Sequence, residues 1–274
     1  MPQKPNYIIS VADLDKDWNG LFAAYWDSWK KPLQATGQLT FVGIGQGGRI
    51  EAEAFSQTKA EYLANAKANP DQTWVKAEDP ERKSQGLSHQ IVGGGVFTMH
   101  RENPFRAARG RQPQIAKPAD AGDEIKLPGP DFEAGTERHK LRRELYTQMW
   151  SWRPKMMATA HADGQGIWVL PEYRQQGAAE ALMEFWMASV DSLGVEAYLE
   201  ASSLAASLYL KYGFVVIKYP TLTFHSEEPS AEWLDLVHDM QSHPISIMWR
   251  PKGGKYVEGK TVLPWLGKPR MWKL

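Results

Sequence analysis

The residues from Ile167 to Ala179 have the composition of an anion-binding turn. Ile167, Trp168, Val169 and Leu170 form an apolar run that predicts a strand, and the polar turn Arg174, Gln175, Gln176 leads to Gly177, Ala178 and Ala179, where a helix begins. A glycine lets the backbone approach a ligand closely, and the first turn of a helix presents unpaired N–H groups to an anion. The spacing predicts either a phosphate-binding turn or an ordinary connection between a strand and a helix.

A second motif follows the next predicted strand, residues 195–201. It reads Ser202-x-x-Ala205-x-x-Leu208-Tyr209-x-Lys211-x-Gly213-Phe214. Together with Pro171-Glu172-Tyr173 and Arg174-x-x-Gly177-x-Ala179, it makes the chain resemble the GNAT superfamily of acyl-CoA-dependent N-acyltransferases, most closely its fungal members. The two motifs cover residues 161–214, and weaker similarity reaches back to Thr73. The family motif has Asn where this chain has Ser202.

The resemblance implies that acetyl-CoA is the cofactor. Its pantetheine would lie along Ile167–Leu170, with an amide near Val169 polarising the thioester carbonyl. Its pyrophosphate would lie on the amides of Arg174–Ala179, and Ser202 would keep a helix-capping oxygen and be a further candidate for a cofactor contact. The resemblance also implies that an amine takes the acetyl group directly, in a ternary complex.

The resemblance further implies an acid, and the residues offer candidates for a base. Tyr209 matches the family tyrosine that protonates the departing thiolate, and a phenol of pKa about 10 stays neutral at pH 7. Without the motif, Tyr209 would be read as an aromatic packed on a helix face. An alkylammonium of pKa about 10.4 must lose a proton before it attacks. Glu200 is the first candidate for that base, with Asp163 and His161 behind it, and each can equally be a structural or surface polar residue.

A glycine-rich segment suggests a different cofactor. Gly43-Ile44-Gly45-Gln46-Gly47-Gly48 satisfies G-x-G-x-x-G, follows an apolar run that predicts a strand over Leu39–Ile44 and precedes a predicted helix, which would suit a dinucleotide. The acidic residues Glu78 and Asp79, however, lie farther on than the roughly 20 residues expected for the ribose contact. A nicotinamide oxidoreductase is therefore an alternative function, and a flexible glycine turn is the simpler interpretation.

Composition excludes several classes of site. The 274 residues include no Cys, which excludes disulfides, Cys-ligated metals and a cysteinyl acyl-enzyme. With 32 basic and 32 acidic side chains, the chain offers no overall electrostatic case for nucleic acid. Seven histidines are too scattered to predict a metal site. Without an apolar run long enough to span a bilayer or a signal peptide, we expect a cytoplasmic protein with no membrane partner.

Periodicity predicts the elements that position these residues. Trp18, Trp26 and Trp29 lie at helical spacing and are expected in the core, or alternatively as an aromatic wall for a small amine. Residues 73–77 and 90–99 predict a hairpin. The other expected elements are strands at 7–11, 167–170, 195–201, 214–218 and 245–249 and helices at 51–68, 137–152, 177–193 and 204–212.

These predictions combine into one organisation. We expect a single mixed α/β (α+β) GNAT domain over residues 1–274, with a central, mostly antiparallel, splayed sheet flanked by helices. An insertion over residues 101–153, an irregular loop followed by a helix, precedes the acetyl-CoA-binding strand, and residues 250–274 form a basic tail. The expected function is acetyl transfer to the primary amine of a small molecule. The alternative is a non-catalytic GNAT-like fold that binds CoA or mediates protein contacts.

Overall fold

The computed structural model describes residues 6–85, 89–102, 104, 127, 129–157 and 161–263. By its internal contacts the chain divides into two compact units. Unit 1 comprises Met1–Thr98 and Gly164–Ser192, and unit 2 comprises Met99–Asp163 and Leu193–Leu274. Both combine strands with helices, so the mixed α/β fold is confirmed. That the whole chain is one domain stays a prediction.

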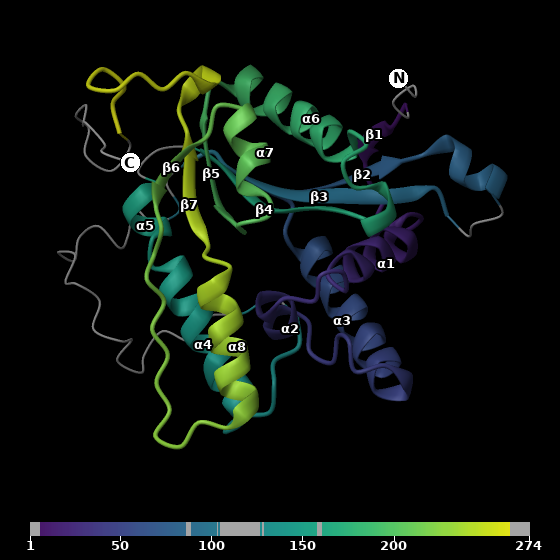
Figure 1. Ribbon diagram of the computed structural model, residues 1–274. Helices are drawn as coiled ribbons and strands as arrows, with labels where there is room; N and C mark the ends of the chain where they lie inside the picture. The colour runs from purple at the N-terminus through teal and green to yellow at the C-terminus, as the bar shows by residue number, and fades with distance from the viewer. Residues whose placement is uncertain are drawn as a thin grey trace. The chain divides into compact units, whose positions relative to one another are not determined.

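Unit 1 is built on four neighbouring strands, of which the last two extend a few residues into unit 2. Strands β1 and β2 pair antiparallel with Val11 opposite Val75, and β2 pairs antiparallel with β3 with Trp74 opposite Val96. The predicted hairpin is thus confirmed. In order across the sheet the strands are β1 (Ile8–Val11), β2 (Gln72–Glu78), β3 (Ile91–His100) and β4 (His161–Val169) (Figure 1).

Helices cover both faces of this sheet. Helices α1 (Trp18–Ser28) and α3 (Gly48–Ala68) lie on one side, and α6 (Ala178–Leu193) lies on the other (Figure 1). On the α1 side the rings of Tyr25 and Trp168 have centroids 4.1 Å apart. On the α6 side Phe97 stacks on Trp186, with centroids 4.5 Å apart. Trp18 and Trp26 are buried in this aromatic core and Trp29 packs against it, as the core interpretation predicts.

Three consecutive glycines in β3 make room for this packing. A Cβ on Gly93 would lie 2.5 Å from the carbonyl oxygen of Trp168. A Cβ on Gly94 would lie 2.7 Å from both the Trp168 ring and Leu21. Real side chains essentially never approach so closely, so Gly93 and Gly94 are required by the position of Trp168 on β4, whereas a Cβ on Gly95 would meet the Phe97 ring at 2.7 Å.

The predicted strand over Leu39–Ile44 is wrong. Residues Ala35–Thr40 form a helix, α2, in which Ala35 and Leu39 lie four residues apart and are both fully buried. The apolar run is therefore explained by helical burial, and Phe41 beyond it enters the aromatic core against Tyr25, with ring centroids 5.0 Å apart. A short apolar run does not by itself separate strand from buried helix.

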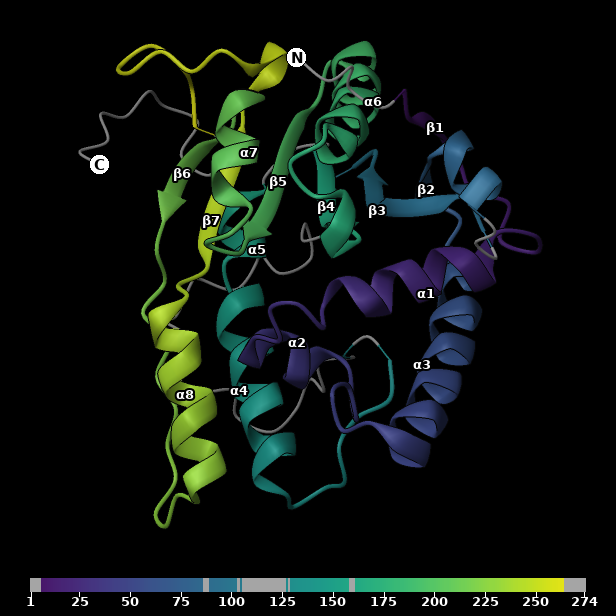
Figure 2. The same ribbon diagram turned by 45° about the vertical axis from the view of Figure 1, so that its right-hand side comes forward.

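Unit 2 contains three strands and four helices in the part that the structure describes. The strands β5 (Glu196–Ala201), β7 (Ser246–Arg250) and β6 (Val215–Lys218) lie in that order and pair antiparallel. Helices α4 (Glu137–Trp150) and α8 (Ala231–Ser242) lie side by side in both views, joined by an ion pair between Arg138 and Glu232 (Figures 1 and 2). The short helices are α5 (Arg153–Met156) and α7 (Ala206–Lys211).

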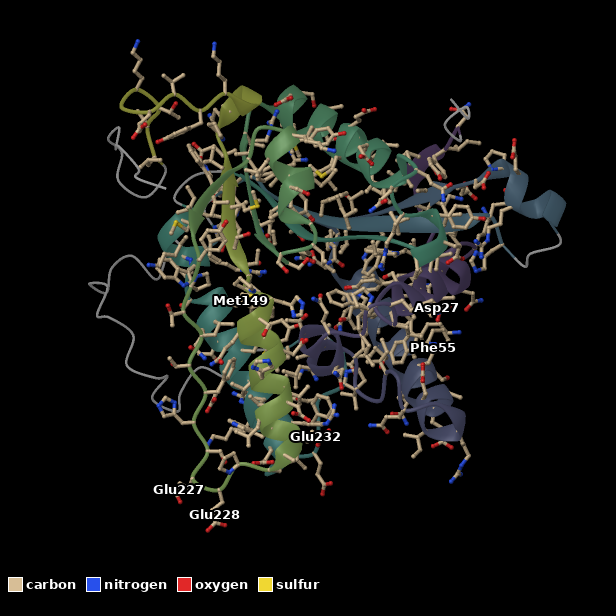
Figure 3. The ribbon with its side chains drawn as sticks, viewed as in Figure 1. Asp27, Phe55, Met149, Glu227, Glu228 and Glu232 are labelled. Atoms are coloured by element: carbon tan, nitrogen blue, oxygen red, sulfur yellow. The ribbon has the colours of Figure 1, made fainter. Side chains whose placement is uncertain are left out.

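Helix α8 was not among the predicted elements, although its signals are in the sequence. The Ser230 hydroxyl accepts a hydrogen bond from the Trp233 amide, which is an N-cap, and Trp233, Leu236 and Met240 are buried at helical spacing. Before the helix, Glu227 and Glu228 lie at the tip of an acidic loop (Figure 3). The prediction overlooked these signals because charged residues surround them.

The predicted insertion over residues 101–153 and the predicted basic tail over residues 250–274 lie only in part within the described residues. The helix at the end of the 101–153 insertion is confirmed as α4, while most of the preceding loop lies outside the described residues. The basic tail is described as far as Leu263. Every helix in the described ranges is too short or too polar to cross a bilayer.

The β3 glycines generate a stability prediction. Gly94→Ala should lower the free energy of unfolding by about 1–3 kcal/mol, because the added methyl overlaps the Trp168 ring and Leu21. Urea denaturation measures the loss. The matched control is Gly166→Ala on β4, where the nearest atoms lie 3.9 Å from the added Cβ. Equal stability of the two variants would contradict the packing argument.

Candidate active site

The predicted strand, turn and helix are present in unit 1. Strand β4 ends at Val169, and the Leu170 amide donates to the Val92 carbonyl at 2.8 Å. A single 3-10 turn over Pro171–Tyr173 follows, and α6 begins at Ala178. Between them Gly177 has a φ of 100°, in the region that a side chain disfavours. The glycine is therefore required by the turn itself.

Backbone N–H groups of this turn are available to a ligand. Among the residues that the structure describes, no well-formed hydrogen bond uses the amides of the five residues Gln175–Ala179. Further along α6, the amide of Ala181 donates to the Gly177 carbonyl at 3.0 Å. Open amides at a helix N-terminus favour an anion, so the residues present fit a phosphate group.

The side chain of Arg174 serves the architecture of the turn. Its guanidinium donates to the carbonyl oxygens of Ser28 at 2.6 Å and Val169 at 3.2 Å, and to that of Lys31. The Ser28 carbonyl lies at the C-terminal end of α1, where helix carbonyls lack partners, and Lys31 lies three residues beyond it. Arg174 therefore joins the end of α1 to the end of β4, and any cofactor contact it makes is through its backbone.

Strand β4 changes the side on which its residues face. An added Cβ at Gly164 would lie 2.6 Å from Trp186 of α6, whereas one at Gly166 would have the Tyr25 hydroxyl of α1 among its nearest atoms. In a regular strand residues two apart share a face. The alternation therefore shifts between these glycines, as in a β-bulge, a feature common beside active sites. Trp168 and Leu170 point into the core, so they offer a ligand only their backbone.

The glycine-rich segment before α3 is already occupied by the protein's own carboxylate. The Glu51 carboxylate accepts from the Gly47 amide at 2.8 Å and from the Trp26 indole at 3.1 Å, and pairs with Lys30 at 2.8 Å. Burial alone would raise the pKa of Glu51, but these hydrogen bonds and the Lys30 charge outweigh it and lower the pKa to about 2. With a helix before it in place of a strand, this segment lacks the geometry of a dinucleotide fingerprint.

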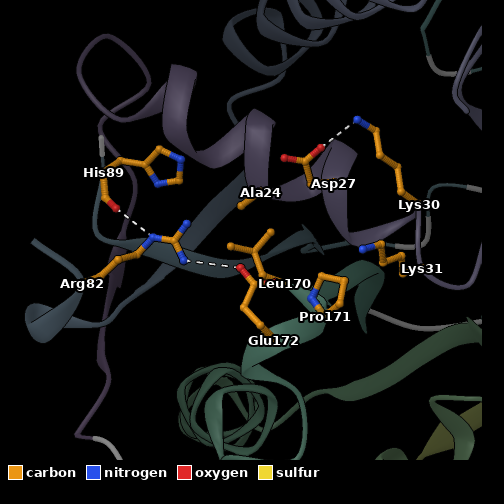
Figure 4. A pocket seen from close by; sticks show the side chains of 9 residues that line it. All are labelled: Ala24, Asp27, Lys30, Lys31, Arg82, His89, Leu170, Pro171 and Glu172. Carbon is orange, nitrogen blue, oxygen red and sulfur yellow. Dashed lines mark hydrogen bonds and ion pairs between the residues drawn. The ribbon is translucent and has the colours of Figure 1, made fainter. Parts of the chain in front are cut away.

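A pocket of about 400 Å³ adjoins the end of β4 in unit 1 (Figure 4). At its rim Arg82 donates to the His89 carbonyl at 3.0 Å and lies 3.7 Å from the Glu172 carboxylate, while Asp27 pairs with Lys30 at 3.0 Å. Burial and the nearby Arg82 lower the pKa of His89, so its imidazole is neutral at pH 7. The pocket is lined by Ala24, Asp27, Lys30, Lys31, Arg82, His89, Leu170, Pro171 and Glu172.

The predicted base, Glu200, is fully engaged within unit 2. Arg153 donates to both of its oxygens, at 2.8 and 2.9 Å, and the Tyr198 hydroxyl donates to one of them at 3.0 Å. Asp163, a further base candidate, lies 3.7 Å from the same guanidinium. The structure thus brings Glu200 and Asp163 together around Arg153. The third candidate, His161, is buried against His100, with ring centroids 4.7 Å apart.

Arg153 was missed by the sequence analysis. Its guanidinium lies over the Trp150 ring, 4.7 Å from the centroid. The available signal was the spacing of three residues between Trp150 and Arg153 at the end of a predicted helix, which allows such a contact. Nothing in the sequence could have paired it with Glu200, 47 residues away.

Tyr209 and Ser202 lie in unit 2. Tyr209 is buried on α7 against Phe214, with ring centroids 5.8 Å apart, and no hydrogen bond of its hydroxyl is found among the described residues. Burial raises the pKa of Tyr209 to about 12. Ser202 departs from its expected role as a side-chain cap: its backbone carbonyl accepts from Ala205 and Ala206, and α7 has no side-chain cap.

The buried phenol predicts a pH-dependent stability. The Tyr209 pKa is about 12 in the folded state and about 10 in the unfolded state, so its contribution is present below about pH 10 and lost as the pH rises toward 12. As the pH rises from 10 toward 12, the free energy of unfolding should therefore fall less for Tyr209→Phe than for the wild type. The difference between the two decreases should approach about 3 kcal/mol. Chemical denaturation at several pH values measures it. Tyr219→Phe, at an exposed position, is the control and should follow the wild type.

One family model matches the chain. Residues 146–216 match the model described as an acetyltransferase (GNAT) domain. This segment contains β4, the turn, α6, β5 and α7 with Tyr209. A comparison with curated proteins finds no match.

Solved structures of acetyltransferases align with most of the chain at low identity. A histone acetyltransferase HPA2 and related acetyltransferase from Corynebacterium glutamicum is 16% identical, over 93% of this chain and 100% of its own, with a TM-score of 0.48. PaiA N-acetyltransferase from Thermoplasma acidophilum, in complex with coenzyme A, is 14% identical over 90% of this chain and 99% of its own, with a TM-score of 0.40. Naa20 from Chaetomium thermophilum is 13% identical over 90% of this chain and 87% of its own, with a TM-score of 0.42.

The family match falls on the segment that carries both chemical motifs. Over residues 146–216 the chain is therefore similar to acetyltransferase (GNAT) domains, and the similarity supports an N-acetyltransferase.

Proposed function

We propose that the protein is an acetyl-CoA-dependent N-acetyltransferase that transfers the acetyl group directly to a primary amine of a small molecule. The observation that carries the proposal is the turn with open amides between β4 and α6, inside the segment that matches the acetyltransferase domain model. The absence of any Cys agrees with transfer that has no cysteinyl intermediate.

The chain would hold acetyl-CoA mainly through its backbone. In the proposal, the amides of Gln175–Ala179 receive the pyrophosphate, and Gly177 allows the close approach that a Cβ would prevent. Ile167, Val169 and their neighbours on β4 supply peptide groups to the pantetheine, and a peptide N–H near Val169 stabilises negative charge on the carbonyl oxygen. When bound, acetyl-CoA would supply the acetyl group as an activated thioester.

Tyr209 provides the proton for the leaving thiolate in this proposal. Its hydroxyl has no partner within the described part of the chain, and burial keeps it neutral at every ordinary assay pH because its pKa is about 12. A neutral phenol near a developing thiolate can donate without first needing to be protonated. A decline in rate above pH 9 would then come from another group.

Glu200 as the base stays a prediction. The three hydrogen bonds that its carboxylate accepts occupy the oxygens that would take a proton from the amine. The geometry favours a fixed Glu200 that holds Arg153 in place.

The finer features belong to the same proposal. A small-molecule acceptor, a cytoplasmic location and an affinity with fungal GNAT members are proposed, and the zero net charge supports an acceptor other than nucleic acid. A non-catalytic GNAT-like protein that binds CoA is the competing function.

One experiment separates these functions. Thermal shift with acetyl-CoA, CoA and NADPH should show stabilisation by the two CoA compounds alone, and thiol release across a panel of amines should then show turnover. The chain has no Cys, so it contributes no thiol background. Stabilisation by CoA without turnover on any amine would favour the non-catalytic function, and stabilisation by NADPH alone would contradict the proposal.

Tyr209→Phe tests the acid. We expect turnover to fall about 10- to 100-fold while the KM for acetyl-CoA stays within about twofold, because the hydroxyl acts on the leaving group and the ring still packs. Steady-state thiol release measures both constants. An unchanged kcat would remove the role.

Gly177→Ala tests the turn. The φ of 100° and the closeness of a bound anion should make the added methyl raise the KM for acetyl-CoA at least about tenfold, with the amine KM unchanged. Gly194→Ala at the other end of α6 is the matched control, since Gly194 also has a positive φ, 59°, but lies away from the turn. Equal effects of the two variants on the KM would show that only helix stability had changed.

A further inference from the structure

Four side chains in unit 2 form a buried ionic cluster that the proposed cofactor site does not use. We name Arg153, Asp163, Tyr198 and Glu200 the Arg153 cluster. The Glu200 carboxylate accepts hydrogen bonds from Nε and Nη2 of Arg153, at 2.8 and 2.9 Å. The Asp163 carboxylate lies 3.7 Å from Nη1 of the same guanidinium, which is beyond hydrogen-bond distance. The guanidinium is thus directed at Glu200, and Asp163 receives only its longer-range attraction.

The Arg153 cluster carries more negative than positive charge. It contains one guanidinium and two carboxylates, and Tyr198 adds a neutral hydroxyl that donates to Glu200. Asp163 is 2% exposed, and its Oδ1 is buried with no hydrogen-bond partner in the described structure. A buried carboxylate oxygen without a partner is costly, because its hydration has been removed and nothing replaces it. A buried polar atom left unsatisfied in this way calls for an explanation, such as a catalytic role or a bound group.

A donor with positive charge suits this oxygen best. A single free carboxylate oxygen suits an N–H of an ammonium, which would also offset the excess negative charge of the cluster. A metal ion is less suitable, since no group of three metal-ligating side chains occurs in the ranges that the structure covers.

We infer that Asp163 binds the ammonium group of the acceptor amine through its Oδ1, and that Arg153 is a positioning residue that holds Glu200 by hydrogen bonds and leaves the Oδ1 of Asp163 without one. The inference rests on the proposed function for the identity of the ligand as the acceptor. It assigns the recognition of a primary ammonium to the start of β4, the strand that also carries Ile167, Trp168 and Val169. It also gives a use to α5, the helix that follows the insertion loop and α4 and carries Arg153.

The burial of Oδ1 sets the expected strength of binding. Because the oxygen is covered, neighbouring side chains must move to admit the ammonium, and part of the interaction energy is spent on that movement. A bare amine should therefore bind weakly, and a high concentration of probe is needed.

The first measurement is the stability of Asp163→Asn without any ligand. Asn has nearly the same shape as Asp but no charge, so removing a buried carboxylate whose Oδ1 accepts no hydrogen bond should raise the midpoint of thermal unfolding, by about 2–4 °C. A merely structural ion pair with Arg153 predicts the opposite sign. The matched control is Glu196→Gln on β5, whose carboxylate accepts from the Trp249 indole at 3.3 Å and which should not become more stable.

The second measurement uses propylammonium chloride as the probe. It should raise the midpoint of thermal unfolding of the wild type but not that of Asp163→Asn. Propanol, which lacks the charge, and tetramethylammonium chloride, which lacks N–H donors, should leave both midpoints unchanged. With an acceptor that turns over, Asp163→Asn should raise the amine KM at least about tenfold, with the acetyl-CoA KM within about twofold.

Two results would overturn the inference. One is a lower midpoint for Asp163→Asn than for the wild type, and the other is an equal propylammonium shift in both proteins. Thermal shift with acetyl-CoA is read separately. If acetyl-CoA fails to stabilise the wild type while propylammonium still distinguishes the two proteins, the ammonium site stands and the proposed acetyl transfer fails.

Discussion

The packing of Trp168 against the glycines of β3 is the constraint on which unit 1 depends. The indole occupies space that any side chain at Gly94 would fill, and it packs in a tilted arrangement against Tyr25 of α1. This one ring therefore fixes the position of β4 against both the neighbouring strand β3 and helix α1. The turn after β4 begins within three residues of that ring, so its position follows from core packing and not from surface interactions.

Charge is distributed differently in the two units. In the turn of unit 1 between β4 and α6 the available groups are neutral peptide N–H donors, assembled by a helix start and a glycine. In unit 2 they are carboxylates, one of which is matched by Arg153 while Asp163 has a free oxygen. The first arrangement favours an anion and the second a cation, as the proposed reaction between a phosphate-bearing donor and an ammonium would require.

Most elements could be predicted from local patterns, and the exceptions have physical reasons. Alternation and glycine placement identified the hairpin, α6 and the turn, because these depend on neighbours in sequence. The run at Leu39 was misassigned because burial of a short helix and of a strand leave the same apolar signature. The engagement of Glu200 by Arg153 could not be predicted, since it depends on tertiary structure that brings distant segments together. Likewise, the motif located Arg174 but not the direction of its side chain.

The anchoring of Arg174 has a consequence for the thermodynamics of ligand capture. Its bonds to Ser28, Lys31 and Val169, and the positive φ of 61° at Gln175, hold the turn in an uncommon conformation before any ligand arrives. A preorganised loop has little conformational entropy left to lose on association. The turn can therefore bind with an affinity set by its own amides, and a weakened anchor would reduce that affinity through disorder alone, with every contact to the ligand still possible.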